Sequence, residues 1–104
     1  MGGHIVQGHV DGTGTVRTLE GPPHACLLQI EAPADLLKYI VEKGFIAIDG
    51  ISLTIASVID TVFTVSVIPY TLNATNLNKV RSGSLVNIEV DILAKYVERI
   101  LSLK

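Results

Sequence analysis

The chain is 104 residues long, 48% of them hydrophobic, and its eight Lys and Arg against ten Asp and Glu give a formal net charge of -2. This length accommodates one hydrophobic core, and the lack of a dense basic cluster argues against nucleic acid as a partner. The single cysteine, Cys26, excludes an internal disulfide, and the apolar runs are too short to span a membrane, so we predict a cytoplasmic protein with no membrane partner.

Alternating apolar residues predict two strands at the start of the chain. They occupy residues 4–10 and 13–19, and Asp11-Gly12 between them is a dipeptide favoured in tight hairpins because it tolerates a positive φ. We therefore expect these two strands to pair with each other. A third strand is expected over residues 25–31, entered from the turn GPPH.

A helical pattern follows in the segment PADLLKYIVEKG, residues 33–44. Pro33 stands at a first helical position that needs no N–H, and Gly44 is a typical helix stop. The apolar residues between them fall on one helical face: Leu36, Leu37, Ile40 and Val41. The segment predicts a short helix.

Alternation with a period of two returns in the second half of the chain. It predicts strands over residues 51–56, 63–68 and 86–91, each with one apolar face. Another apolar segment precedes Asp49-Gly50, which forms the turn into the first of these strands. Together with the earlier segments, the pattern predicts about six half-buried strands.

After Asp91 the period changes to 3.6. Six apolar residues then form one stripe: Ile92, Leu93, Tyr96, Val97, Ile100 and Leu101. This pattern predicts an amphipathic C-terminal helix, preceded at residues 71–83 by a polar loop with a helical turn. Because short strands avoid open edges by closing, we predict an all-β fold with short helices: a closed six-stranded Greek-key β-barrel over residues 1–91 and the helix over residues 92–104.

The three histidines are the first candidates for a metal site. No cysteine or acidic residue stands at tetrahedral-site spacing from His4 and His9, and residues five apart on a strand face opposite sides of a sheet. We therefore predict no metal site. The residues alone leave open whether His4, His9 and His24 act in a site or bond to the backbone at strand ends.

Hydroxyl and carboxylate side chains mark three further candidates. Ser52 and Thr54 share one strand face about 7 Å apart, which suits a polyol or the edge of a heterocycle, although a solvent-facing strand gives the same pattern. Thr71 lies just beyond Pro69, which ends a strand near the barrel mouth. Asp91 fits a helix N-cap, a ligand contact, or both.

Four motifs, in this order and at this spacing, resemble the riboflavin synthase α chain: GGHIVQGHVDGTG, KYIVEKGFIAIDGISLT, IPYTLNATNL and VNIEVDILAKYVERIL. The family's chain is a tandem of two similar six-stranded barrels and a C-terminal helix through which three chains associate. Along essentially its whole length, this sequence is similar to the second barrel and that helix. The resemblance implies that the first barrel is missing, with Met1 standing where it would run into the second.

The resemblance implies a dismutation that needs no metal and no cofactor. Two molecules of 6,7-dimethyl-8-ribityllumazine meet, one donates a four-carbon unit to the other, and riboflavin and a pyrimidinedione leave. In the family each barrel holds one lumazine, and the site forms where the first barrel of one chain faces the second barrel of its neighbour. The expected partners are this substrate, the product riboflavin and further copies of the chain, three in the full-length family.

Carried onto this sequence, the resemblance also assigns residues. The catalytic ones are His9 near the reacting rings, Ser52 placing or activating a nucleophile, and the acidic Asp91. The substrate-binding ones are His4 at the strand start, Lys43 and Gly44 at the rim, and Thr54, Ile68 and Thr71 against the ring and the ribityl chain. Tyr70 stands where relatives carry other polar residues, so its contact with the ribityl chain is not carried over.

Two functions of different classes remain open. The chain is either half of an enzyme, contributing one catalytic face, or a non-catalytic lumazine- or flavin-binding module similar to this family. The presence of His9, Ser52 and Asp91 favours the enzyme. An oligonucleotide-binding barrel would need basic and aromatic residues on one strand face, and the sequence supplies neither.

Overall fold

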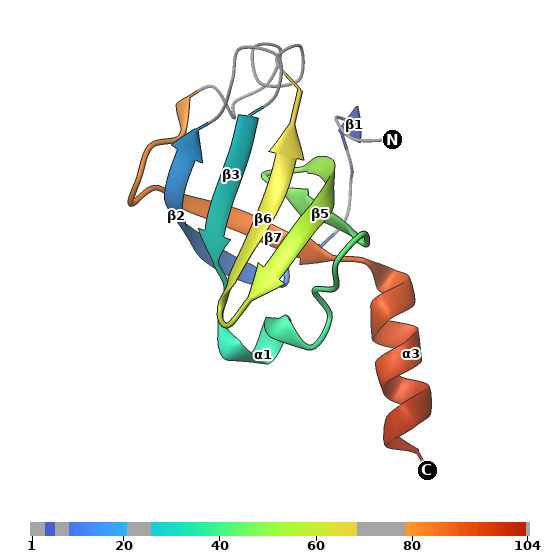
Figure 1. Cartoon of the computed structure of the whole chain (residues 1–104). Helices are drawn as coiled ribbons and strands as arrows, with labels where there is room; N and C mark the ends of the chain where they lie inside the picture. The colour runs from blue at the N-terminus through green and yellow to red at the C-terminus, as the bar shows by residue number, and fades with distance from the viewer. Residues whose placement is uncertain (1–3, 6–8, 21–25, 69–78, 104) are drawn as a thin grey trace.

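The computed structural model describes residues 4–5, 9–20, 26–68 and 79–103 (Figure 1). Its strands are β1 (His4–Ile5), β2 (Gly12–Glu20), β3 (Cys26–Glu31), β4 (Phe45–Ile48), β5 (Ile51–Ile59), β6 (Val62–Val67) and β7 (Leu85–Val90). Its helices are α1 (Ala34–Leu37) and α3 (Ile92–Ser102). Every pairing between these strands is antiparallel.

Six of the strands close into a barrel. Neighbours follow the order β5-β4-β7-β2-β3-β6, and pairing of β5 with β6 completes the circle. β4, β5 and β6 are consecutive neighbours, and β3 lies beside β6 rather than beside β4, which is a Greek-key arrangement. The predicted closed six-stranded barrel is confirmed, and β1 is a short addition to the edge of β5.

The barrel interior is filled by the apolar residues that alternation singled out. Ile51, Leu53 and Ile55 of β5 are buried, while Ser52 and Thr54 between them are half-buried on the outer face. The other strands contribute inward side chains in the same way: Val16, Leu28, Ile30, Ile46, Ile48, Phe63, Val65, Val67, Val86, Ile88 and Val90. The alternation fixes which residues face outward, and these include the candidate site.

The beginning of the chain differs from the prediction. In β1, His4 pairs with Ser52 of β5, and His9 and Val10 are not in a strand. The predicted hairpin through Asp11-Gly12 is therefore wrong. Gly12 already lies in β2, paired with Ile88 of β7, and the Asp11 side chain accepts a hydrogen bond from the β7 backbone, so the chain runs along β7 instead of turning back.

The predicted helix over residues 33–44 is real but shorter. α1 ends at Leu37, and Tyr39 and Ile40 then donate backbone hydrogen bonds to carbonyls three residues earlier. Lys43 adopts φ 68 and donates to the Ile55 carbonyl, so the backbone must leave the helix to enter the β4–β5 pairing. Most of the predicted loop at residues 71–83 lies outside the described residues.

The C-terminal helix is present where it was predicted. α3 begins directly after Asp91 and extends away from the barrel (Figure 1), in agreement with overall dimensions of 47 × 25 × 20 Å. None of its residues is buried. No helix in the described part of the chain is long and apolar enough to cross a membrane.

Candidate functional site

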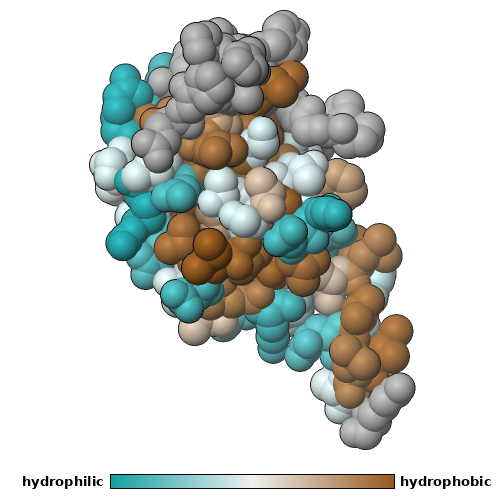
Figure 2. All heavy atoms as spheres, in the orientation of Figure 1, coloured by the Kyte–Doolittle hydropathy of each residue, from teal (hydrophilic) through white to brown (hydrophobic). Residues whose placement is uncertain are grey.

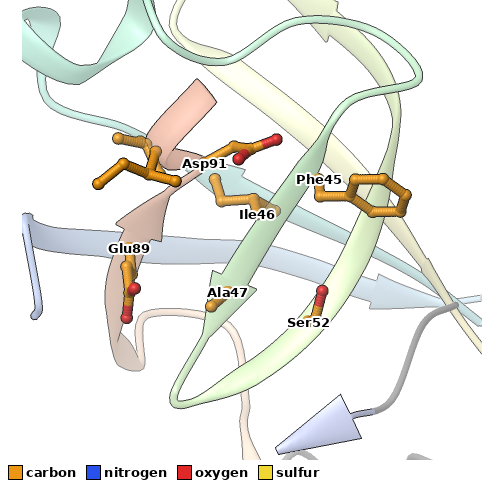
Figure 3. Close-up of a pocket in the computed structure, with 8 residues that line it drawn as sticks. Phe45, Ile46, Ala47, Ser52, Glu89 and Asp91 are labelled. Carbon is orange, nitrogen blue, oxygen red and sulfur yellow. The ribbon is translucent and has the colours of Figure 1, made fainter. Parts of the chain in front are cut away.

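A pocket of about 270 Å³ lies on the outer face of the barrel, where β4, β5 and β7 meet the start of α3 (Figure 3). Eight residues line it: Phe45, Ile46, Ala47, Ser52, Glu89, Val90, Asp91 and Ile92. Six come from three neighbouring strands, Asp91 is the N-cap of α3, and Ile92 is the first residue of that helix. Two of the three residues predicted to be catalytic, Ser52 and Asp91, therefore lie in one pocket although they are far apart in the sequence.

Strand register explains how the lining residues come together. Ala47 of β4 is opposite Ser52 on one side and Glu89 on the other, so the three form a row across the sheet, as Figure 3 shows. Directly opposed residues of an antiparallel pair point to the same face. Because Leu53 and Ile88 point into the core, this row must point outward. On the far side of Ser52, the main chain of His4 continues the row.

Asp91 occupies the junction between strand and helix. Its Oδ1 accepts a hydrogen bond from the Leu93 backbone N–H at 3.1 Å, which confirms the predicted N-cap. Within the described part of the chain, neither its second carboxylate oxygen nor the Ser52 hydroxyl takes part in a hydrogen bond. The cap therefore leaves one carboxylate oxygen available at the pocket.

The pocket combines apolar walls with a few polar groups. Phe45, Ala47, Val90 and Ile92 offer aliphatic and aromatic surface, and Phe45 and Ile92 remain 43% and 59% exposed at the rim. Ser52 can donate and accept hydrogen bonds, whereas ionised Glu89 and Asp91 can only accept them. Such a surface suits a flat heterocycle that carries hydroxyl or N–H donors.

Three other predicted residues lie on or beside the β4–β5 hairpin without lining the pocket. Thr54 is paired with Phe45 and half-buried on the outer face. Lys43 and Gly44 lead directly into β4, and the Gly44 carbonyl accepts from the Ile55 N–H at 2.9 Å. A Cβ added at Gly44 would lie 3.0 Å from the Val41 carbonyl oxygen, which favours glycine at this turn.

The remaining predicted residues are not brought into the pocket by the described structure. His9 is exposed just before β2, and Ile68 is 53% exposed just after β6; neither lines the pocket. Thr71 lies outside the described residues, and for His4 only the main chain is described. The site as described therefore rests on β4, β5, β7 and α3.

Six of the eight lining residues were not among the predicted site residues, and Phe45 and Glu89 are the most informative of them. Phe45 shares a face with Ala47, Ser52 and Thr54 through the β4–β5 register, and the turn at Asp49-Gly50 is the signal that could have fixed this register. Glu89 alternates with the buried Ile88 and Val90 and shares a face with Asp91. The sequence carried this alternation, but not the fact that β7 would lie beside β4.

Comparison with known proteins adds the family. The model of the lumazine binding domain matches residues 7–91. This chain belongs to the lumazine-binding domain family. Among curated members, it is 47% identical over 101 residues to the riboflavin synthase of Actinobacillus pleuropneumoniae and 50% identical over 95 residues to that of Chlamydia muridarum. These matches span 97% and 91% of this chain but 47% and 46% of the relatives, so this lumazine-binding domain has about half their length.

LumP, a protein that aligns with this chain in fold, has been solved in complex with ligands. The crystal structure of LumP complexed with 6,7-dimethyl-8-(1'-D-ribityl) lumazine aligns with 82% of this chain and 48% of that chain, with a TM-score of 0.78 and 27% identity. The complex of LumP with riboflavin aligns with a TM-score of 0.77. The family match and the curated relatives confirm the predicted resemblance to riboflavin synthase, and the alignment with LumP confirms the predicted barrel fold.

Proposed function

We propose that this domain binds 6,7-dimethyl-8-ribityllumazine, and riboflavin as the product, in the pocket between β4, β5, β7 and α3. The observation that carries the proposal is the convergence of Ser52 and Asp91 on one pocket with apolar walls. The ring would lie against Phe45 and Ala47. The ribityl hydroxyls would donate to the carboxylates of Glu89 and Asp91 at the pocket edge. That solved LumP structures of the same fold hold these ligands supports the ligand class.

For the reaction, we propose that the domain supplies one of the two sites of a riboflavin synthase. One lumazine would donate a four-carbon unit to the other, so that the acceptor leaves as riboflavin and the donor as a pyrimidinedione. Because donor and acceptor are the same compound, the exchange is redox-balanced without a cofactor or metal. The protein would mainly hold two rings face to face, a juxtaposition worth on the order of 7–11 kcal/mol of the barrier.

Within that reaction, Ser52 and Asp91 would contact the lumazine ring that is bound in the pocket. Ser52 would place or activate a nucleophile, and the free oxygen of Asp91 would accept or return a proton. His9, exposed just before β2, would act at the second ring that approaches from outside. Lys43, Gly44, Thr54, Ile68, Thr71 and His4 would contribute binding contacts around the ring and ribityl chain.

A second ring requires a second barrel, and we propose that α3 recruits it by association between copies of the chain. Its stripe of Ile92, Leu93, Tyr96, Val97, Ile100 and Leu101 is exposed along the helix. Figure 2 shows apolar side chains gathered along α3, away from the barrel. Deleting residues 92–104 should lower the mass measured by sedimentation, and an unchanged mass would remove the helix from the interface.

A non-catalytic lumazine- or flavin-binding module is the alternative. The observation that favours it is the alignment with LumP, whose solved structures are titled as complexes with the lumazine, riboflavin and flavin mononucleotide. Turnover separates the two functions. A half-enzyme should form riboflavin from lumazine once a separately expressed first barrel is added, and the formation should fall in His9→Ala or Asp91→Asn. No riboflavin under any of these conditions would favour the binding module.

The pocket itself is tested by fluorescence titration with riboflavin. Ser52→Ala should weaken binding about 2–10-fold through the loss of one hydrogen bond. Asp91→Asn should weaken it by about tenfold or more, because Asn still caps the helix but removes a charged acceptor. Ser66→Ala on the exposed face of β6 and Asp60→Asn in the β5–β6 turn are the matched controls. Equal affinities for all four variants would place the ligand elsewhere.

A further inference from the structure

The Asp11 side chain joins the barrel to the C-terminal helix. Its Oδ2 accepts a hydrogen bond from the Val90 backbone N–H at 2.8 Å, and its Oδ1 accepts one from the Lys95 ammonium group. The Asp11 backbone N–H also donates to the Ile88 carbonyl at 2.8 Å. Asp11 therefore contacts the last residue of β7 and the first full turn of α3, on either side of Asp91.

This contact is partly buried, chiefly on the side of Asp11. The Asp11 side chain is only 12% exposed, whereas that of Lys95 is 40% exposed. The hydrogen bond to Asp11 raises the pKa of Lys95 above its ordinary value of 10.5, against the opposing effect of burial. An ammonium group held this way stays charged across the physiological range, so the carboxylate keeps its partner.

Little else fixes the direction of α3 in the described structure. The helix buries no side chain, and its other ion pair with the barrel, between Lys38 and Glu98, spans 3.7 Å with both side chains more than a third exposed. Exposed pairs of this kind contribute little. The orientation of the helix, and with it the positions of Asp91 and Ile92 in the pocket, must then depend strongly on the contact at Asp11.

We propose that the Asp11–Lys95 ion pair is a positioning device that holds Asp91 in the lumazine pocket by fixing α3 against the barrel. The inference rests on the proposed function, because Asp11 and Lys95 do not line the pocket and act only by positioning a residue that does. Asp11 holds the residue before Asp91, and Lys95 holds the helical turn after it. Breaking the pair frees the junction to rotate, and the pocket loses its wall at Asp91 and Ile92.

The test compares two substitutions that each remove one ion pair between the barrel and α3. Lys95→Met breaks the pair with Asp11, and Lys38→Met breaks the exposed pair with Glu98. Riboflavin affinity should fall on the order of 3–10-fold in Lys95→Met, within the range by which positioning substitutions change coupling, and less than about twofold in Lys38→Met. Asp11→Asn, which keeps an acceptor for the Val90 N–H, is the second variant and should match Lys95→Met.

A double-mutant cycle separates positioning from a general loss of structure. If Lys95 acts through the junction at Asp91 and Ile92, then Lys95→Met should weaken riboflavin binding less in an Asp91→Asn background than in wild type. Equal affinity of Lys95→Met and wild type, or fully additive effects of Lys95→Met and Asp91→Asn, would overturn the inference.

Hydrogen exchange distinguishes failure of this inference from failure of the proposed function. The amides of Leu93 to Lys95 should exchange faster in Lys95→Met than in Lys38→Met, whether or not riboflavin binds. If wild type binds no riboflavin, the proposed function fails while the exchange result still decides whether the pair holds the junction. Unchanged exchange in Lys95→Met would overturn the positioning role by itself.

Discussion

The barrel and the C-terminal helix use the same apolar residue types with opposite results. Ile88 and Phe63 of the barrel are fully buried, whereas Ile100 and Leu101 of α3 are 60% and 57% exposed. An alternating pattern on strands that close on themselves buries its apolar face within one chain. The apolar stripe of α3 is not covered by the barrel, because the helix extends away from it (Figure 1). The barrel is therefore stabilised by its own apolar core, whereas α3 adds no buried side chain to that core.

The length of α3 sharpens this difference. With 11 residues, it falls below the length at which isolated helices are more than marginal in water. Its N-terminal cap at Asp91 and the ion pair of Lys95 with Asp11 stabilise its first turn, and Ser102 donates a hydrogen bond to the Arg99 carbonyl near its end. The four predictions below test the comparison, from the largest expected effect on the free energy of unfolding to the smallest.

Removing a large side chain from the barrel should have the largest effect. Phe63→Ala should lower the free energy of unfolding by about 3–5 kcal/mol, because it removes buried surface and leaves a cavity. Leu101→Ala on α3 is the control and should change the stability of the barrel by less than about 0.5 kcal/mol. Urea unfolding followed by circular dichroism measures both. Similar losses in the two variants would mean that barrel and helix unfold as one core.

Adding a single methyl group inside the barrel should have the next largest effect. A Cβ at Gly14 would lie 2.6 Å from Ile30 Cγ2, 2.7 Å from Ile88 Cδ1 and 2.9 Å from a backbone carbonyl oxygen. Gly14→Ala should therefore cost about 1–3 kcal/mol through overpacking.

Gly12→Ala is the matched control on the same strand. Its Cβ would meet chiefly the end of the Leu36 side chain, at 3.0 Å, which calls for a much smaller shift than the three contacts at Gly14. The melting temperature measured by thermal unfolding should be lower for Gly14→Ala than for Gly12→Ala. The reverse order would show that the barrel interior adapts where β2 is crowded.

Most of the barrel could be predicted from the sequence because its signals are local. Alternation identified the inward face of β5, β6 and β7, and the change of period after Asp91 identified α3. The hairpin at Asp11-Gly12 was wrong because the turn propensity of a dipeptide does not reveal a competing long-range partner. Asp11 bonds to the backbone of Val90, 79 residues away, and no local pattern carries that information.

The site was predicted less completely for a related reason. Ser52 and Asp91 were singled out by residue type and by resemblance, and the structure places both in one pocket. Phe45 and Glu89 were missed because they join the pocket only through the pairing of β4 with β5 and β7. A strand order cannot be read from alternation alone, since alternation gives the face of a strand but not its neighbours.

High pH should remove the stabilisation contributed by the Lys95–Asp11 contact, an effect smaller than those of the two barrel substitutions. The pKa of Lys95 is raised in the folded protein by its hydrogen bond to Asp11, so the stability it contributes is fully present below its ordinary pKa of 10.5. That contribution is lost as the pH rises through the higher, folded-state pKa. The stability difference between wild type and Lys95→Met should therefore narrow above about pH 10.5. A difference that stays constant up to pH 12 would show that the ammonium charge is not what stabilises the junction.

Placing a charge on the helix stripe should have the smallest effect on the barrel and a large effect on assembly. Ile100 is exposed, so Ile100→Glu should change the unfolding free energy of the single chain by less than about 0.5 kcal/mol. If α3 associates with further copies, burying that carboxylate in an apolar contact is costly, and the sedimenting mass should fall toward that of one chain. Such association would also make the wild-type melting temperature rise with protein concentration, and this dependence should disappear in Ile100→Glu. Glu98→Gln, on the polar side of the same helix, is the control and should keep the wild-type mass. A variant that keeps both the mass and the concentration dependence of wild type would show that the exposed stripe is not where copies of the chain meet.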